Sequence, residues 1–137
     1  MPAGPAGWHT GAMSDAVSSG GPRVRIRIVL GEDAMLGPGK ADLLERIRQT
    51  GSIAAAGRAM GMSYKRAWML VGEMNAAFRE PLVDSTRGGP AGGGARLTGA
   101  GEAVLATYRE IEEITAEAGA AGIAALQAMA KGPGGTE

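Results

Sequence analysis

The residues of this 137-residue chain that could carry chemistry are basic and hydroxylated rather than catalytic. The chain has no cysteine and a single histidine, His9. It therefore offers no disulfide, no cysteine ligands for zinc, and neither a histidine-based catalytic triad nor a multi-histidine metal site. The sequence shows no nucleophile–base pair and no metal-binding cluster of another kind either, so we expect neither an enzyme nor a bound cofactor.

The most informative run, SYKRAW, spans residues 63–68. Ser63 and Tyr64 can donate hydrogen bonds to phosphates, Lys65 supplies a positive charge, and Arg66 can pair bidentately with guanine. If the run opens a helix, its N-terminal amides add a further site for anions. These residue types predict contacts to DNA, and the alternative is a solvated basic turn.

The residues just before this run have the spacing of a helix-turn-helix. Gly61 supplies the positive φ that a tight turn needs, and Gly57 provides a small residue where two helices cross. Met62 is the apolar residue after the turn, and Ala67 follows six residues after Gly61. The alternative is an ordinary helical hairpin. Trp68 is more typical of a partly buried packing residue than of a base contact.

A strand is expected before these helices. Residues 23–30 alternate arginine with aliphatic residues, which predicts a half-buried strand with Val24, Ile26 and Ile28 inward. Gly31 ends it.

Three helices then follow, each bounded by capping and breaking residues. The expected spans are Pro38 to a cap at Gly51, Ser52 to Ala59 or Met60, and Ser63 to about Phe78 or Arg79 before Pro81.

Residues 82–87 and 95–98 form two short strand-like pieces around a glycine-rich tip at 88–94. A nucleotide-binding P-loop would end in Gly-Lys-Ser/Thr, whereas Gly94 is followed by Ala95. The segment therefore predicts a flexible hairpin, or wing.

In a wing, Arg87 and Arg96 could reach a DNA backbone or minor groove, and Gly88 and Gly89 would permit a close approach. The alternative is a hairpin loop with no binding role.

Thr98 can cap a long helix whose apolar residues recur at three- and four-residue steps. Its alanine-rich, heptad-like seam extends beyond what a small body can cover, which favours dimerisation over packing on the same domain. The candidate interface residues on this helix are Val104, Tyr108, Ile111, Ile114 and Ala118.

The net charge of zero hides a strong asymmetry along the chain. Residues 22–98 hold twelve lysines and arginines against seven acidic residues, a net charge of +5, whereas residues 99–137 hold two against six, a net charge of −4. A basic body suits phosphate binding. The expected divisions are a disordered leader at 1–21, a winged helix-turn-helix domain at 22–98, a dimerisation helix at 99–131 and a disordered tail at 132–137. With neither a transmembrane run nor a signal peptide, a cytoplasmic location is expected.

The chain also resembles a known family. The residues that carry the resemblance are Gly51-Ser52-Ile53, Gly61 through Trp68, Glu73-Met74-Asn75, Leu82-Val83, the glycines of 88–94 and Leu97 through Gly101. Over about residues 22–118 they are similar to the N-terminal DNA-binding domain of the ModE family of molybdate-responsive transcriptional regulators, and more distantly to LysR-type winged helices.

This resemblance implies a mainly α winged helix-turn-helix with a small β-hairpin, which binds operator DNA as a homodimer through its first and last helices. Leu43 and Ile47 would then belong to the dimer interface. Full-length members carry C-terminal domains that bind molybdate, whereas this chain ends about twenty residues beyond residue 118. The resemblance therefore implies DNA binding, whereas the domains that bind molybdate in full-length members are not expected in this chain.

The resulting prediction is a homodimeric regulator of transcription that binds double-stranded DNA sequence-specifically and is linked to molybdenum metabolism. The alternative is a winged-helix interaction module that pairs with a separate effector-sensing protein. The predicted DNA contacts are Ser52, Ser63, Tyr64, Lys65, Arg66, Trp68, Arg87, Gly88, Gly89 and Arg96.

Overall fold

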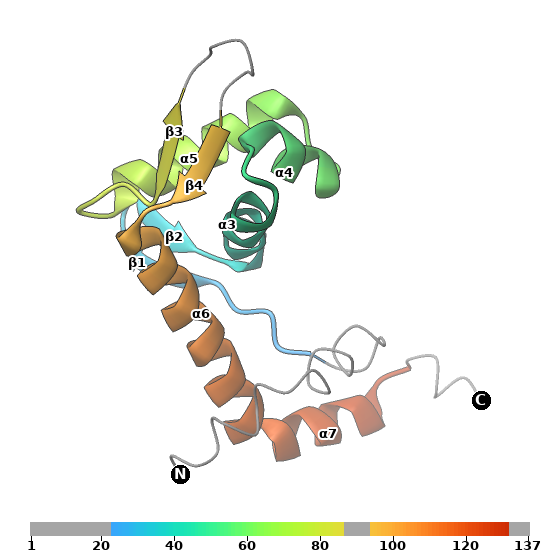
Figure 1. Cartoon of the computed structure of the whole chain (residues 1–137). Coiled ribbons are helices and arrows are strands. Elements are labelled where there is room, and N and C mark those ends of the chain that lie inside the picture. The colour runs from blue at the N-terminus through green and yellow to red at the C-terminus, as the bar shows by residue number, and fades with distance from the viewer. Residues whose placement is uncertain (1–22, 87–93, 132–137) are drawn as a thin grey trace. The chain divides into compact units, whose positions relative to one another are not determined.

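The computed structural model describes residues 23–86 and 94–131 (Figure 1). Its packing divides the chain into a unit of Arg25–Arg109, here called the winged-helix unit, and a second unit of Met1–Val24 with Glu110–Glu137. The described residues 110–131 are called the C-terminal unit, and each unit is described by itself. The predicted leader and tail lie outside the described residues.

The winged-helix unit begins with a small antiparallel hairpin. β1 (Ile28–Gly31) pairs with β2 (Ala34–Leu36), with Ile28 opposite Leu36. The predicted strand at 23–30 is therefore shorter than expected, although burial does alternate through Ile28. Among the described residues, no strand pairs with residues 23–27, and the carbonyl of Ile26 instead accepts a 2.6 Å hydrogen bond from the Tyr108 hydroxyl. β2 was not predicted, because three residues are too few to show an alternating pattern.

Three helices follow at the predicted positions: α3 (Pro38–Thr50), α4 (Ile53–Ala59) and α5 (Tyr64–Ala77). Local chemistry sets their ends. Gly51 ends α3 at a φ of 73°, and its N–H donates to the carbonyl of Ile47. The hydroxyl oxygens of Ser52 and Ser63 accept hydrogen bonds from the third residue of the helix that each precedes, both at 3.0 Å.

A second hairpin forms the wing. β3 (Val83–Thr86) and β4 (Gly94–Leu97) are antiparallel, with Val83 opposite Leu97. The N–H of Ala95 donates a 2.9 Å hydrogen bond to the carbonyl of Gly51. The base of the wing is thereby joined to the turn between α3 and α4, and Figure 1 shows the hairpin and α4 at the same end of the unit.

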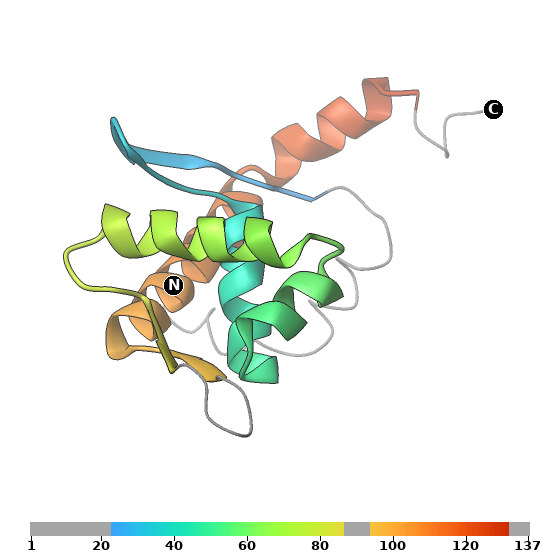
Figure 2. The ribbon, with the colours of Figure 1, turned by 90° about the horizontal axis from the view of Figure 1, so that it is seen from above.

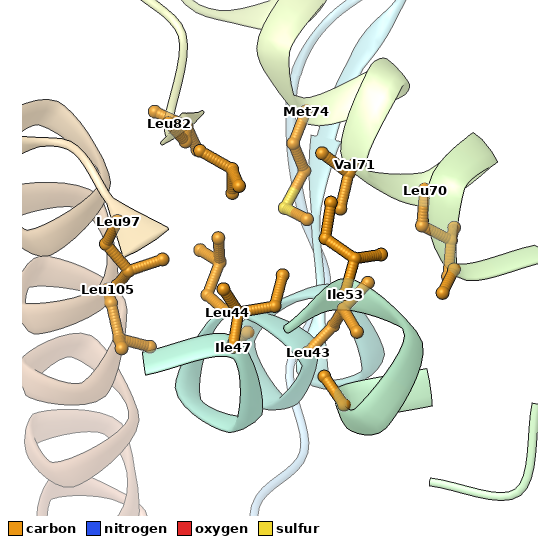
Figure 3. Packing of buried hydrophobic residues seen from close by; sticks show 14 of the residues in the cluster. Leu43, Leu44, Ile47, Ile53, Leu70, Val71, Met74, Leu82, Leu97 and Leu105 are labelled. Carbon is orange, nitrogen blue, oxygen red and sulfur yellow. The ribbon is translucent and has the colours of Figure 1, made fainter. Parts of the chain in front are cut away.

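The core lies where α3, α4, α5 and the wing meet (Figure 3). α3 runs through its centre, since Leu43, Leu44 and Ile47 are all 0% exposed. α5 contributes the buried residues Ala67, Leu70, Val71 and Met74, which lie on one face of the helix. The wing and the following helix close the core with Leu82, Val83, Leu97, Leu105 and Tyr108.

The C-terminal segment forms two helices rather than one. α6 (Gly99–Ala118) ends one residue before Gly119, and α7 (Ala120–Met129) follows directly. Thr98 caps α6 as expected, because its hydroxyl oxygen accepts a 3.0 Å hydrogen bond from the N–H of Gly101. Glycine has a low helix propensity, which favours a break at residue 119. α6 belongs to the winged-helix unit as far as Arg109.

Among the described residues, no helix combines the length and the apolar character that crossing a membrane requires.

Candidate nucleic-acid interface

The N-terminal turn of α5 presents its polar side chains outward. Ser63, Tyr64, Lys65 and Arg66 are all exposed, whereas Ala67 is 0% exposed and packs in the core. The oxygen of Ser63 accepts the capping hydrogen bond from the N–H of Arg66, which leaves its hydroxyl proton available to a phosphate. The predicted contact residues are therefore brought together on one accessible turn.

Lys65 and Arg66 also have no acidic partner in the part of the chain that the structure describes. Within the described ranges, neither side chain forms an ion pair or a hydrogen bond with an acidic residue. An exposed cation without a partner can bind an external anion without first breaking an internal salt bridge. This pair thus gives the start of α5 an unneutralised positive charge.

An aromatic pair lies beside these cations. The rings of Tyr64 and Trp68 meet edge to face at 5.9 Å between centroids, as residues one helical turn apart can. Trp68 was expected to be a partly buried packing residue. Its ring instead packs against that of Tyr64 at the surface, and Trp68 is 39% exposed. Tyr64 is 57% exposed.

Met69 is a candidate contact that was not predicted from the sequence. It is 46% exposed on the outward face of α5. In the sequence, Met69 lies off the helix face formed by Ala67, Leu70, Val71 and Met74, a position that indicates contact with solvent or a partner but not which of the two. An exposed apolar side chain there could contact a thymine methyl group.

The close crossing of α4 and α5 positions this turn. A Cβ added to Gly57 would lie 2.9 Å from the Cβ of Ala67, so only glycine fits at residue 57 without a shift. Gly61 has a φ of 73°, and the N–H of Met62 donates a 2.9 Å hydrogen bond to the carbonyl of Gly57. Both glycines thus have the roles that the helix-turn-helix spacing predicted.

The wing is only partly described. Arg87, Gly88 and Gly89 lie outside the described residues. Arg96 is exposed on β4, but it stands directly opposite Asp84 in the strand register, so an acidic neighbour offsets part of its charge.

Ser52 lies at the base of the wing. It is half-buried and caps α4, next to Gly51, whose carbonyl holds β4. Its place beside the wing is compatible with a phosphate contact by its hydroxyl proton.

The predicted dimer residues separate into two groups. Leu43, Ile47 and Tyr108 are 0%, 0% and 1% exposed, so they lie in the core of their own chain and could reach a second copy only if that core opened. Val104 is half-buried and packs against the same core. The remaining three residues are in the C-terminal unit: Ile114 is 49% exposed, Ala118 is exposed and Ile111 is half-buried.

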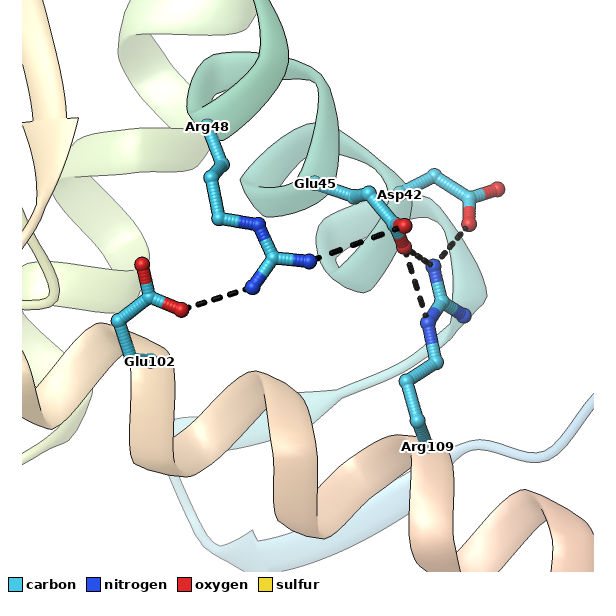
Figure 4. A network of polar contacts seen from close by, with 5 residues as sticks. All are labelled: Asp42, Glu45, Arg48, Glu102 and Arg109. Carbon is cyan, nitrogen blue, oxygen red and sulfur yellow. Dashed lines mark hydrogen bonds and ion pairs between the residues drawn. The ribbon is translucent and has the colours of Figure 1, made fainter. Parts of the chain in front are cut away.

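Ion pairs hold the first part of α6 against α3 (Figure 4). The guanidinium of Arg109 contacts Glu45 at 2.7 Å and Asp42 at 2.9 Å, and Arg48 contacts Glu102 at 2.7 Å. These contacts, with the buried Tyr108, show why residues 99–109 pack with the winged-helix unit.

The described residues contain no group of three or more histidine, cysteine or acidic side chains placed to hold a metal ion. The geometry is instead a surface of exposed cations, hydroxyls and an aromatic pair on a helix-turn-helix.

Comparison with known proteins finds a family model that matches part of this chain. Residues 40–102 match the family described as bacterial regulatory helix-turn-helix protein, lysR family. This is a family of regulators rather than of enzymes. The match spans α3 through the start of α6 and includes the whole surface described above.

Several curated proteins are similar over the same region. The molybdenum-pterin-binding protein MopB of Rhodobacter capsulatus is 49% identical over 79 residues, which cover 58% of this chain and 29% of that protein. The transcriptional regulator ModE of Yersinia pestis is 42% identical over 71 residues, covering 52% of this chain and 27% of the relative. ModE of Escherichia coli K12, named a DNA-binding transcriptional dual regulator, is 37% identical over 81 residues, covering 59% and 31%. The chain thus spans less than a third of the length of these relatives.

A solved structure shares the fold. The CbnR_DBD chain from a crystal structure titled as a DNA complex superposes with a TM-score of 0.51 at 24% sequence identity, covering 64% of this chain and 95% of that chain. The likeness confirms the winged helix-turn-helix architecture.

Proposed function

We propose that this chain binds double-stranded DNA sequence-specifically as a homodimeric regulator of transcription, because residues 40–102 match the LysR-type helix-turn-helix family and part of the chain is similar to ModE proteins. In this proposal the first turns of α5 enter the major groove and the wing contacts the backbone or the minor groove beside it.

One observation carries the proposal: Lys65 and Arg66 are exposed at the start of the second helix of the motif and have no ion-pair partner among residues 23–86 and 94–131. In helix-turn-helix proteins, this part of the second helix contacts the edges of bases. An arginine there can pair with guanine, while a lysine and the hydroxyls of Ser63 and Tyr64 can bind phosphates and set the register. Trp68 and Met69 would add apolar contacts.

The C-terminal unit supports the homodimer. α7 has no buried residue among those described, and its sequence is almost entirely apolar or small. Ile114, Leu126 and Met129 are 49%, 66% and 74% exposed. Monomeric proteins rarely leave such apolar surface uncovered, and a second copy of the same helices would cover it. Ile111 and Ala118 belong to this proposed surface.

A link to molybdenum metabolism is part of the proposal. It is supported by relatives that are named as molybdenum-pterin-binding proteins or as molybdenum transport proteins. Since the similar region covers less than a third of those proteins, the proposal assigns molybdate sensing to a part outside this region or to a separate partner. Regulation of this kind would take place in the cytoplasm, where the DNA of a bacterial cell is accessible.

The test is selection of duplexes from a random pool by the full chain, followed by affinity measurements at several salt concentrations. The expected result is an enriched site with two half-sites about 34 Å apart, one helical turn. The affinity should fall by about 0.9 log unit per log unit of salt for each phosphate contacted. An unenriched pool with salt-insensitive binding would overturn the proposal. A protein partner that survives nuclease treatment would then favour an interaction module instead.

A further inference from the structure

Exposed large apolar side chains occur in three places among the described residues. Two of them, α5 and the C-terminal unit, belong to the surfaces in the proposed function. The third is Val29 and Leu30 on β1, with exposed fractions of 66% and 54%. Neither DNA binding nor pairing of the C-terminal helices requires these two side chains.

The strand that carries them has an open edge. β1 pairs with β2 on one side, and Figure 2 shows β2 between β1 and α5. On its other side, no strand among the described residues pairs with β1. The register is irregular between Val29 and Gly31, so Leu30 has no partner in β2. An edge strand presents unpaired backbone N–H and C=O groups, which form a template for pairing with another chain.

The two ends of this strand are flanked by charges of opposite sign. Arg25 and Arg27 precede it, and Glu32 and Asp33 form the turn that follows it. All four side chains are exposed, and none forms an ion pair within the described part of the chain. Two copies of β1 aligned antiparallel would place the arginines of each beside the acidic turn of the other. A parallel alignment would place like charges together.

We infer that β1 is a self-association surface, on which β1 of a second copy pairs antiparallel across a two-fold axis. Val29 and Leu30 of both copies lie at the centre of this contact, and the charged ends set the direction and register of the strands. The residues of this surface are different from those of the proposed contact between C-terminal helices, so the two contacts together join dimers into larger assemblies. This inference does not depend on DNA binding.

Reciprocal charge reversal tests it in the full chain without DNA. One variant carries Arg25→Glu with Arg27→Glu, and the other carries Glu32→Arg with Asp33→Arg. Each variant alone would oppose like charges across the two-fold axis, so sedimentation velocity should show the larger assembly weakened at least about tenfold. An equimolar mixture restores it, because every charged end then meets an opposite one.

Two further variants separate the apolar contact from general effects. Val29→Ser with Leu30→Ser should also abolish the larger assembly, whereas Met69→Ser, which removes an exposed apolar side chain elsewhere, should leave it intact. Circular dichroism checks that each variant is folded, as expected for exposed positions. Unchanged assembly in the serine double variant, or no recovery in the charge-reversed mixture, would overturn the inference.

Discussion

Arg66 and Lys65 are adjacent cations, but they differ in what they can contribute to a DNA complex. The planar guanidinium of Arg66 can bind a guanine edge through two parallel hydrogen bonds, whereas the ammonium of Lys65 acts as a point charge toward phosphate. Both side chains are exposed, so truncating either should leave the domain folded. Their effects on binding should therefore differ in kind.

We expect Arg66→Ala to weaken binding to the selected site by about 1–3 kcal/mol and to relax the sequence preference at one base pair. Lys65→Ala should weaken binding to all sequences alike and lower the salt dependence by about one phosphate contact. Titrations of matched and mismatched duplexes at several salt concentrations measure both effects.

Arg79→Ala is the control for these two variants. It removes an exposed arginine just beyond the other end of α5 and should change binding little. An equal loss of affinity in all three variants would mean that general charge, and not the start of α5, determines binding.

Asn75 is a polar residue whose importance is structural. Its Oδ1 accepts hydrogen bonds from the N–H groups of Leu82 and Val83 at 2.8 and 3.1 Å, and its Nδ2 donates to the carbonyl of Val83 at 3.2 Å. Leu82 and Val83 are buried at the start of the wing. One side chain thus joins α5 to the wing.

Asn75→Ala should lower the free energy of unfolding by about 1–3 kcal/mol, since it leaves buried backbone groups without partners. Chemical denaturation measures this change. Asn75→Asp keeps the shape and the acceptor but loses the Nδ2 donor, so we expect it to destabilise as well. Full stability in both variants would contradict the assigned role.

At the scale of elements, alanine substitutions at two glycines in neighbouring helices should change the stability of the domain in opposite directions. Gly57 lies at the crossing of α4 and α5, where an added Cβ would come 2.9 Å from Ala67. Gly72 is within α5, exposed, and an added Cβ there meets nothing within 4 Å.

Gly57→Ala should therefore destabilise the domain by about 1–3 kcal/mol through overpacking. Gly72→Ala should stabilise it by about 0.5–1 kcal/mol, because alanine loses less backbone entropy in a helix. Thermal unfolding of the two variants provides the comparison. A stabilising alanine at residue 57 would show that α4 and α5 do not cross as closely as described.

The junction between the wing and α6 contains a glycine position that tolerates a side chain even less. A Cβ added to Gly101 would overlap the carbonyl group of Leu82, which is backbone and cannot rotate away. Gly101 is buried in the first turn of α6, just after the cap formed by Thr98. The start of α6 can therefore lie against the beginning of the wing only because residue 101 has no side chain.

At the scale of the whole molecule, the proposal depends on two copies acting together. Leu126→Glu with Met129→Glu places charges on the exposed apolar surface of α7 and should dissociate the dimer formed by the C-terminal helices. Because one copy then contacts a single half-site, affinity for a two-half-site duplex should fall toward that for one half-site. Light scattering and DNA titration measure the two effects.

Gln127→Glu is the matched control for this variant. It adds a negative charge to the same exposed helix without removing an apolar side chain, so it should leave both dimerisation and DNA affinity nearly unchanged. A Leu126→Glu, Met129→Glu chain that still dimerises and binds normally would place the dimer contact elsewhere.

Local signals in the sequence were sufficient for α3, α4 and α5 and their caps, whereas the break between α6 and α7 was not predicted. Gly51, Ser52, Gly61 and Ser63 act through their own backbone angles and through hydrogen bonds to residues at most four positions away, so their roles can be inferred without knowing the fold. The helix-turn-helix and the exposed turn at its second helix were predicted for this reason.

Contacts between distant segments could not be inferred in this way. An apolar stripe shows that a helix face is covered but not what covers it. Tyr108 was expected at a dimer interface because of such a stripe, and Leu43 and Ile47 because of the family resemblance. In the structure they fill the core of their own chain, and the bond from Tyr108 to the Ile26 carbonyl spans 82 positions. The sequence by itself therefore determined the three central helices, the strands of the wing and the chemistry that the start of α5 exposes. Only the tertiary structure decided which apolar faces meet each other and which remain open, because that depends on which segments come to lie side by side.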